Sequence, residues 1–391
     1  MAQLPTPSIQ NGSRHGRIAD AKGLKAWDGF QLLCKLIAPT SPRHAAPPDT
    51  VNWELVNWDV VIDQAEAHKV SPAVWRSIDG FAGVPNSVKA YFHVLRDKNA
   101  QRNAAILDGL STALARLNEL GIKAAPLKGA ASIASGLYDD PAERFLSDVD
   151  LLIAPEHAQA SADALRALGY TDLCPDSGIP WITPRRHHLP PLLSRQGFSV
   201  ELHTALVQRK FEPMLPTAEV WQRASEERWR GRTIHFLHPT DRVVHNIVHS
   251  QLHDLSSTGV VELRQLRELS FLIARYSQKM DWSEVERRFR AAGHQDVMFD
   301  QLTYCRMLMG VGSPIGEADP ETSIKRLKSA VSDAAGPARS GAAALKRLIR
   351  DYALWFSANP SLALNLINPL GWPRRIRLMF SLLKRGEHRA D

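Results

Sequence analysis

Apolar residues recur at helical spacing through the first 120 residues of the chain. Residues 27–37 carry them three and four positions apart, which predicts an amphipathic helix. The spacing returns over residues 53–78, after the proline-rich segment APTSPRHAAPPDT, and again over residues 88–120 as one long or two shorter helices. Residues 1–25 show no such period and are rich in proline, glycine, serine and basic residues, so we expect a flexible arm.

The pattern changes at Gly121 from long amphipathic helices to short apolar stretches that alternate with helices. The apolar stretches cover residues 121–127, 145–153 and 198–206, and the helices cover residues 132–138 and 155–169. Apolar stretches of this length are typical of strands, and strands that alternate with helices predict an α/β core. We expect this core to span residues 104–210.

Helical spacing takes over again after about residue 216. The expected helices cover residues 241–254, 260–276, 282–292 and 295–309. The sequence therefore predicts a mostly helical α+β fold, in which the small core is embedded between an N-terminal helical region (26–103) and a C-terminal helical region (211–391). We find no internal repeat.

The composition of the 391 residues is that of an ordinary globular protein, with 44% hydrophobic and 23% charged residues. No run approaches the ~20 apolar residues that a membrane-spanning helix needs, and the polar N-terminus has no signal-peptide core. We therefore expect a cytoplasmic protein without a membrane span. Three cysteines stand far apart without CxxC spacing and are expected to be reduced thiols: Cys34, Cys174 and Cys305.

A net charge of +7 suggests nucleic-acid binding, but the charge is unevenly distributed. Residues 337–391 hold ten basic and three acidic residues, whereas residues 104–210 hold ten basic and twelve acidic ones. The excess therefore belongs to the C-terminal tail, whose NPLGWPRRIRLMFSLLKR stretch is basic and amphipathic. We expect the tail to fold back as a terminal helix, with contact to nucleic acid or an anionic membrane as the alternative.

Two aspartates lie inside the apolar stretch FLSDVDLLI. Because side chains alternate across a strand, Asp148 and Asp150 face the same side and repel each other. A divalent cation relieves this repulsion, and Mg²⁺ prefers carboxylate and phosphate oxygens. Glu201, in the apolar stretch FSVELHTAL, offers a third carboxylate. The alternative is structural: the aspartates cap the strand or pair with Arg144.

A Lys-Gly pair precedes these acids at the start of a predicted helix. The amide groups and dipole of a helix N-terminus favour a phosphate, Gly129 permits close approach of the backbone, and Lys128 adds a positive charge. A Lys-Gly pair alone usually indicates a turn. Followed by an Asp-X-Asp strand, it indicates a site for metal-supported nucleotidyl or phosphoryl transfer.

These residues carry a resemblance to a known family. The segments LKGAA (127–131), SDVDLLI (147–153) and VELH (200–203), together with Arg144, resemble the uncharacterised bacterial nucleotidyltransferase family of the DNA polymerase β-like superfamily. The resemblance implies a short mixed sheet, two catalytic Mg²⁺ ions with Mn²⁺ as a substitute, and an NTP as substrate. It implies transfer of a nucleoside monophosphate to an acceptor, with release of pyrophosphate.

The resemblance also implies the roles of individual residues. Asp148 and Asp150 would bind both ions, with Glu201 as the third carboxylate. The nucleotide would be bound by Lys128, Gly129, Ala130, Arg144, Ser147 and His188. The chain departs from the superfamily pattern at Ala130, where glycine or serine is usual, and in a longer gap between Gly129 and Asp148.

Several other residues have two interpretations each. His203 lies two residues beyond Glu201 on the same strand face. It is either a general base or acceptor-orienting group, or a hydrogen-bonded structural histidine. Arg144 binds phosphate or pairs with Asp148 or Glu143. The basic loop 185–188 covers the nucleotide or is only solvated.

A row of histidines on one predicted helix has two interpretations as well. His245, His249 and His253 follow at intervals of four residues, and they ligate a metal, pack the helix or line an acceptor pocket. Arg264 and Arg267 on the next helix are further candidates for substrate contacts.

The leading hypothesis is a Mg²⁺-dependent nucleotidyltransferase whose acceptor is a small molecule, a peptide or a protein, with RNA ranked last. Two alternatives stay open. One is a non-catalytic nucleotide- or partner-binding module with the same fold, suggested by Ala130 and the long gap. The other is a nucleic-acid binder that uses the basic tail.

Overall fold

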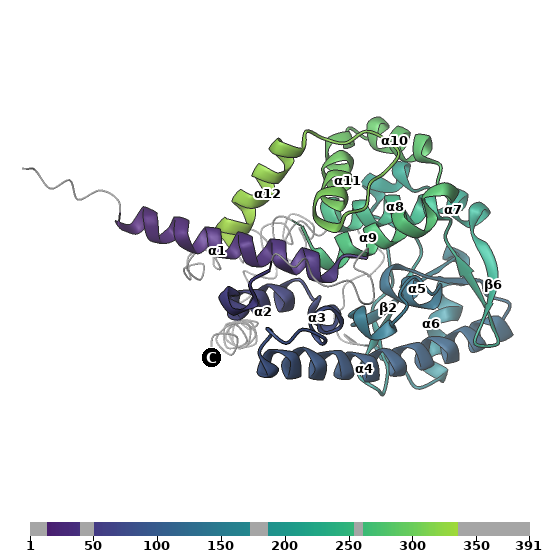
Figure 1. Cartoon of the computed structure of the whole chain (residues 1–391). Coiled ribbons are helices and arrows are strands. Elements are labelled where there is room, and N and C mark those ends of the chain that lie inside the picture. The colour runs from purple at the N-terminus through teal and green to yellow at the C-terminus, as the bar shows by residue number, and fades with distance from the viewer. Residues whose placement is uncertain (1–13, 40–50, 173–186, 254–260, 335–391) are drawn as a thin grey trace, which may run out of the picture. The chain divides into compact units, whose positions relative to one another are not determined.

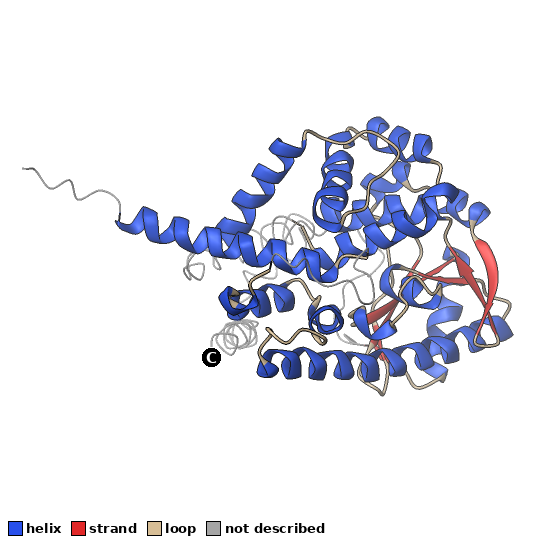
Figure 2. Ribbon diagram, viewed as in Figure 1, coloured by secondary structure: helices blue, strands red, loops and turns tan. Residues whose placement is uncertain are grey.

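The fold is mostly helical, with a small five-stranded sheet and a two-stranded hairpin among the helices of the described residues (Figure 2). The computed structural model describes residues 14–39, 51–172, 187–253 and 261–334. The predicted α+β class and the mixed sheet are confirmed. The C-terminal tail, with its expected terminal helix, and Cys174 lie outside the described residues. In the part of the chain that is described, no helix is long and apolar enough to cross a membrane.

Four helices precede the sheet. They are α1 (Arg14–Ile37), α2 (Trp58–Ala67), α3 (Ser71–Ile78) and α4 (Asn86–Glu119), with a 3-10 turn at Trp53–Leu55. Helix α1 begins at Arg14, so half of the segment expected to be a flexible arm is helical. Helix α4 is one long helix, and it crosses position 104, where we expected the core to begin.

Five short strands form the sheet, in the order β1-β2-β5-β4-β3. They are β1 (Ala124–Pro126), β2 (Asp148–Ile153), β3 (Thr171–Asp172), β4 (Leu192–Leu193) and β5 (Ser199–His203). The central pair, β2 and β5, is parallel, and the other neighbours are antiparallel. The parallel pairing of β2 and β5 is the part of the sheet that carries the site described below.

Helices cover the sheet and bury its central strand. Helix α5 (Lys128–Ala134) contacts β1 and β2, while α4 and α6 (Ala158–Ala167) pack against the sheet residues from below in the view of Figure 1. A Cβ at Gly109 of α4 would lie 2.2 Å from the ring of Phe198, so glycine permits this close approach. Every residue of β2 except the half-buried Asp148 is buried, because both faces of the strand are covered.

A second, two-stranded sheet follows where we expected only helices. Strands β6 (Ser225–Trp229) and β7 (Arg232–Phe236) form an antiparallel hairpin. Its turn residues, Arg230 and Gly231, both have positive φ angles, 48° and 76°, as a tight hairpin turn requires. The side chain of Asn118, near the end of α4, bonds both the amide and the carbonyl of Thr233 and fixes the hairpin there. The all-helical prediction after residue 216 was wrong here.

The later part of the described chain forms six α-helices. They are α7 (Thr217–Arg223), α8 (Pro239–Ile247), α9 (Leu263–Tyr276), α10 (Trp282–Ala291), α11 (Gln295–Met309) and α12 (Pro320–Ala334). Helices α8 to α11 lie in the predicted places, whereas α7 and α12 were not among the expected helices. Helix α8 continues into a wider π-helical turn at Val248–His253. Such turns are rare and often lie at functional sites. Helices α8 and α9 pack together and border the site described next.

Candidate active site

The register between the two central strands brings the predicted carboxylates together. Asp150 of β2 lies directly opposite Glu201 of β5, and Asp148 lies opposite Ser199. Because opposite residues of paired strands share a face, the three carboxylates lie on one side of the sheet. Asp150, Glu201 and His203 each offer one possible ligand atom, and these three atoms lie within 4.8 Å of one another.

Asp150 is the centre of the polar contacts. Its Oδ1 lies 2.8 Å from Nε2 of His203 and 3.1 Å from Nζ of Lys128. The same Nε2 lies 3.7 Å from Oε2 of Glu201. Asp150 and His203 are both buried, whereas Glu201 is partly exposed. Two positively polarised nitrogens therefore compensate one buried carboxylate.

The two aspartates of β2 have opposite pKa shifts. Burial, and then the neighbouring charge of Asp150, raises the pKa of Asp148. Burial also opposes charge on Asp150, but Lys128 and the hydrogen bond from His203 outweigh it and hold the pKa of Asp150 well below its usual value. The protein therefore stabilises the ionised form of Asp150, and the negative charge of Asp150 disfavours ionisation of Asp148.

Lys128 and Gly129 begin helix α5, as predicted, but the glycine has a packing role. A Cβ at Gly129 would lie 2.6 Å from Cδ2 of Leu146 and 2.9 Å from Cζ of Arg144. Lys128 has a positive φ of 49°, a conformation that L-residues rarely adopt. Ala130 is buried at 2% exposure, so its side chain faces the core.

Arg144 pairs with a residue that we did not single out. Its guanidinium is buried, lies 2.7 Å from Glu268 of α9 and bonds the carbonyl of Phe145. The alternative interpretation, a pair with Asp148 or Glu143, was wrong, because Glu143 instead bonds Arg76 and Arg267. Glu268 lies on the buried face of α9, where an acid requires a partner.

Ser147 and His188 lie at the margin of the carboxylates. The hydroxyl of Ser147 is 3.2 Å from Oδ1 of Asp148. Nδ1 of His188 donates to the carbonyl of Leu189 at 2.8 Å and lies 3.8 Å from Oε2 of Glu201. The rings of His187, His188 and His203 lie 5.1–5.2 Å from one another. Arg185 and Arg186 lie outside the described residues.

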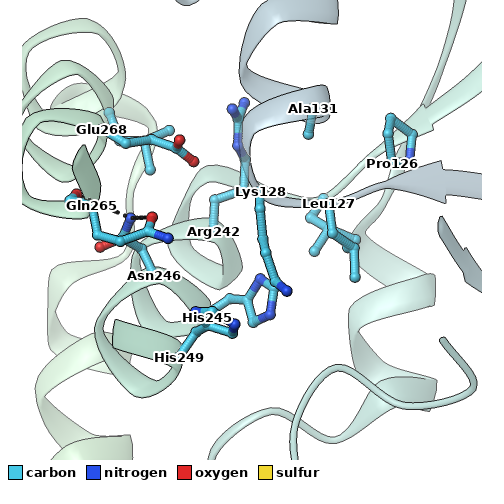
Figure 3. Close-up of a pocket in the computed structure, with 12 residues that line it drawn as sticks. Pro126, Leu127, Lys128, Ala131, Arg242, His245, Asn246, His249, Gln265 and Glu268 are labelled. Atoms are coloured by element: carbon cyan, nitrogen blue, oxygen red, sulfur yellow. Dashed lines mark hydrogen bonds between the residues drawn. The ribbon is translucent and has the colours of Figure 1, made fainter. Parts of the chain in front are cut away.

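A polar pocket adjoins Lys128 on the side of helices α8 and α9 (Figure 3). Lys128 extends along it toward His245 and His249, and Asn246 bonds Gln265 across it. Arg242 lines the pocket from α8 and donates hydrogen bonds to the hydroxyls of Ser132, in α5, and Ser135, which caps the C-terminus of α5. The group of possible metal ligands among the described residues contains neither His245 nor His249, and the side chain of His253 lies outside what the structure describes.

The sequence analysis missed Arg242, Asn246 and Gln265. Each lies on the buried face of an amphipathic helix. A polar residue at a core-facing position of such a helix is the signal by which the sequence could have identified them.

The described residues form a mostly helical α+β fold whose small mixed sheet presents Asp148 and Asp150 on one strand and Glu201 on the adjacent parallel strand. The chain belongs to the uncharacterised nucleotidyltransferase family, whose model matches residues 54–310.

One solved structure similar to the chain is that of an antigenic nucleotidyltransferase-like protein from Paracoccidioides brasiliensis. The identity is 16%, the TM-score is 0.34, and the match covers 54% of this chain and 94% of that chain. No curated protein matches the sequence.

Proposed function

We propose that the protein is a divalent-metal-dependent nucleotidyltransferase that moves a nucleoside monophosphate from an NTP to an acceptor. An oxygen of the acceptor forms a bond to the α-phosphorus, and the bond from that phosphorus to the pyrophosphate oxygen breaks. The acceptor proton leaves to solvent. The observation that carries the proposal is the position of Asp148, Asp150 and Glu201 on one face of two parallel strands, beside Lys128.

The residues present fit a divalent cation. Asp150 is ionised and Glu201 lies near it, while the raised pKa of Asp148 is the response of a buried carboxylate to an uncompensated neighbour. We infer that Asp148, Asp150 and Glu201 hold Mg²⁺, or Mn²⁺ in its place, in the two-ion arrangement of the DNA polymerase β superfamily. The bound cations would stabilise negative charge on the phosphates and lower the pKa of the acceptor oxygen.

The other site residues bind and orient the nucleotide. Lys128 offers its ammonium group to the phosphates from the border of the pocket, next to Asp150. The backbone amides of Gly129 and Ala130 lie in the first turn of α5. Ser147, directly before β2, and His188, which bridges to His203 of β5, flank the carboxylates. Arg144, bonded to Glu268, holds α5 against α9 and is a positioning residue in this proposal.

We place a single polar group of the acceptor in the pocket beside Lys128, because its cavity of about 20 Å³ has room for about one water molecule and not for a nucleobase. Its polar lining combines two amides, Asn246 and Gln265, and two imidazoles, His245 and His249, with the charged side chains of Lys128, Arg242 and Glu268. Amides and imidazoles bind hydroxyl and amide groups in either direction of donation.

A non-catalytic nucleotide-binding module is the second candidate. The observation that favours it is the ion pair between Lys128 and Asp150, which occupies the carboxylate oxygen that a catalytic metal needs. A nucleotide alone would then bind through Lys128 and the start of α5. The third hypothesis, nucleic-acid binding through the tail, concerns residues outside the described ranges.

The deciding experiment uses purified full-length protein, α-labelled NTPs, Mg²⁺ or Mn²⁺, and panels of hydroxylated small molecules, peptides, proteins and RNA ends. We expect label transfer that falls about a thousandfold or more in Asp148→Ala and Asp150→Ala, because a metal contributes several kcal/mol to such a transition state. Asp163→Ala, an exposed acid on α6, is the matched control and should retain activity. Transfer that survives in the double variant would contradict the mechanism, and tight NTP binding without turnover on any acceptor would favour the binding module.

A further inference from the structure

A histidine completes the ligand set at the third carboxylate. Nε2 of His203 lies 2.8 Å from Oδ1 of Asp150 and 3.7 Å from Oε2 of Glu201. Ligands that share one ion at roughly 2.0–2.2 Å from the metal lie about 3–4 Å from one another. The separation from Glu201 has this size, whereas the 2.8 Å hydrogen bond to Asp150 would have to open slightly and Lys128 would have to leave the same oxygen as an ion binds.

His203 is held in this position by the sheet. It lies two residues beyond Glu201 on β5, so both side chains face the same side, and its backbone pairs with Leu152 of β2. Its side chain is 1% exposed and cannot turn toward solvent without opening the core. The imidazole is therefore preorganised toward the carboxylates, as an inner ligand must be.

His188 supports this corner without sharing its role. Its Nδ1 donates to the carbonyl of Leu189, which fixes the proton on the ring nitrogen nearest Glu201. A nitrogen that carries a proton cannot ligate a metal, and the backbone carbonyl holds this proton on Nδ1. Nε2 of His203 instead donates its proton to the carboxylate of Asp150, so an ion bound there would take the place of that proton, which leaves to solvent. The tilted ring of His188 lies 5.1 Å from that of His203 and fills the space beside it.

We propose that Asp150, Glu201 and His203 form a nitrogen-containing metal site that prefers Mn²⁺ to Mg²⁺. Mg²⁺ is a hard ion that takes oxygen ligands, whereas imidazole suits the first-row transition metals. In this arrangement Nε2 of His203 binds the ion and does not take the proton of the acceptor. The inference rests on the proposed function, because it identifies the ion of the same site.

Electron paramagnetic resonance of the full-length protein with Mn²⁺ alone tests the ligand set without turnover. We expect the spin-echo spectrum of bound Mn²⁺ to show modulation from a directly bound ¹⁴N nucleus. We expect the same modulation in His188→Asn. A wild-type spectrum of bound Mn²⁺ without ¹⁴N modulation would overturn the proposal. This test does not depend on whether any variant folds.

The loss of the imidazole tests the preference between the ions. In His203→Asn we expect the ¹⁴N modulation to disappear and the affinity for Mn²⁺ to fall about tenfold or more, as removal of a metal-site partner typically causes. The affinity for Mg²⁺, measured by competition, should change less than about twofold because Mg²⁺ gains little from nitrogen. His235→Asn is the matched control, since His235 is also a buried strand histidine beside a carboxylate, Glu226. Equal losses for both ions would overturn the proposal.

The two proposals fail in different ways. If nucleotidyl transfer occurs with Mg²⁺ and Mn²⁺ bound without nitrogen, only the preference for Mn²⁺ is wrong. If the Mn²⁺ spectrum shows nitrogen but no NTP is bound or turned over, the metal site stands and the proposed function is wrong.

Discussion

The ammonium of Lys128 and the imidazole of His203 meet at the same oxygen of Asp150, at 3.1 Å and 2.8 Å. Burial opposes charge on Lys128, but the carboxylates of Asp150 and Asp148 outweigh it and raise its pKa. Lys128 is therefore a fixed internal cation in the nucleotide-free protein. An added metal ion has to displace it from Asp150, and the phosphates of an NTP would then offer the ammonium a new partner.

Removing this internal cation should strengthen metal binding and weaken nucleotide binding. In Lys128→Met we expect the affinity for a divalent ion without nucleotide to rise several-fold, because the competing charge is gone. We expect NTP affinity to fall about tenfold, the loss of one charge-assisted contact of roughly 1.4 kcal/mol. Isothermal titration calorimetry measures both.

Two comparisons keep this prediction sharp. Lys123→Met removes an exposed lysine near the same strand and should leave both affinities unchanged. Lys128→Met should also unfold at a lower temperature in a chelator and regain stability with added metal, since a bound ion compensates Asp150 again. A variant that loses affinity for both metal and NTP would show that Lys128 supports the site instead of competing for it.

The acidic triad was predictable from the sequence because strand geometry is regular. Asp148 and Asp150 share a face by the two-residue period, and the same period places His203 beside Glu201. The pairing of β2 with β5 then required only that two buried apolar stretches lie in one sheet. The start of α5 at Lys128 followed from the same local pattern.

Contacts between distant parts of the chain were not predictable. Arg144 finds Glu268 at a separation of 124 residues, and nothing in the local sequence of either residue identifies the other. The hairpin of β6 and β7 was missed because its strands are mostly polar and exposed, so the alternation that marks a strand is weak. The pocket beside Lys128 also depends on tertiary packing of α5, α8 and α9.

A side chain at Gly129 should destabilise the fold. In Gly129→Ala the new Cβ meets Leu146 and Arg144 at less than 3 Å, and overpacking of this kind costs about 1–3 kcal/mol. Urea unfolding measures the change. Gly80→Ala is the control, because a Cβ there meets nothing within 4 Å, and it should be close to neutral.

The partner of the clash provides a second check. Leu146→Ala is itself destabilising, because Leu146 is buried, but it removes the atom nearest the new Cβ, so the double variant should lose less stability than the sum of the two single losses. Full stability of Gly129→Ala alone, combined with weaker NTP binding, would instead indicate that glycine is required for access of the phosphate.

Breaking the buried ion pair of Arg144 should lower the stability of the fold more than it lowers the affinity for the nucleotide. In Arg144→Met we expect a loss of about 3–5 kcal/mol, because Glu268 is left as a buried charge without its main partner. Changing Glu268 to Gln in that background should restore part of it. The matched control is Arg166→Met, a partly exposed pair with Asp172, which should cost at most about 1 kcal/mol. An unchanged unfolding curve with a reduced NTP affinity would assign Arg144 to phosphate binding.

His68 should make the fold sensitive to acid at a site remote from the metal residues. Burial lowers its pKa to about 4, against a weaker opposing effect of Glu262. The ring packs edge-on against Phe30 at 5.6 Å, and its Nδ1 accepts a long hydrogen bond from the amide of Leu263 at 3.5 Å. Protonation would place a charge between α1, α2 and α9.

The direction of the pH effect follows from the lowered pKa. Between pH 6.5 and 4 the unfolded chain binds a proton at His68 that the folded chain does not, so stability falls as the pH falls through this window. Since the side chain is only partly shielded, we expect a loss of about 1–2 kcal/mol. His68→Gln should lose less stability than the wild type over the same window, whereas His93→Gln, at an exposed position, should follow the wild type. Urea unfolding of the wild type and of each variant at pH 6.5, 5.5 and 4.5 measures the free energy of unfolding. The same dependence of this free energy on pH in the wild type and in His68→Gln would show that His68 does not contribute.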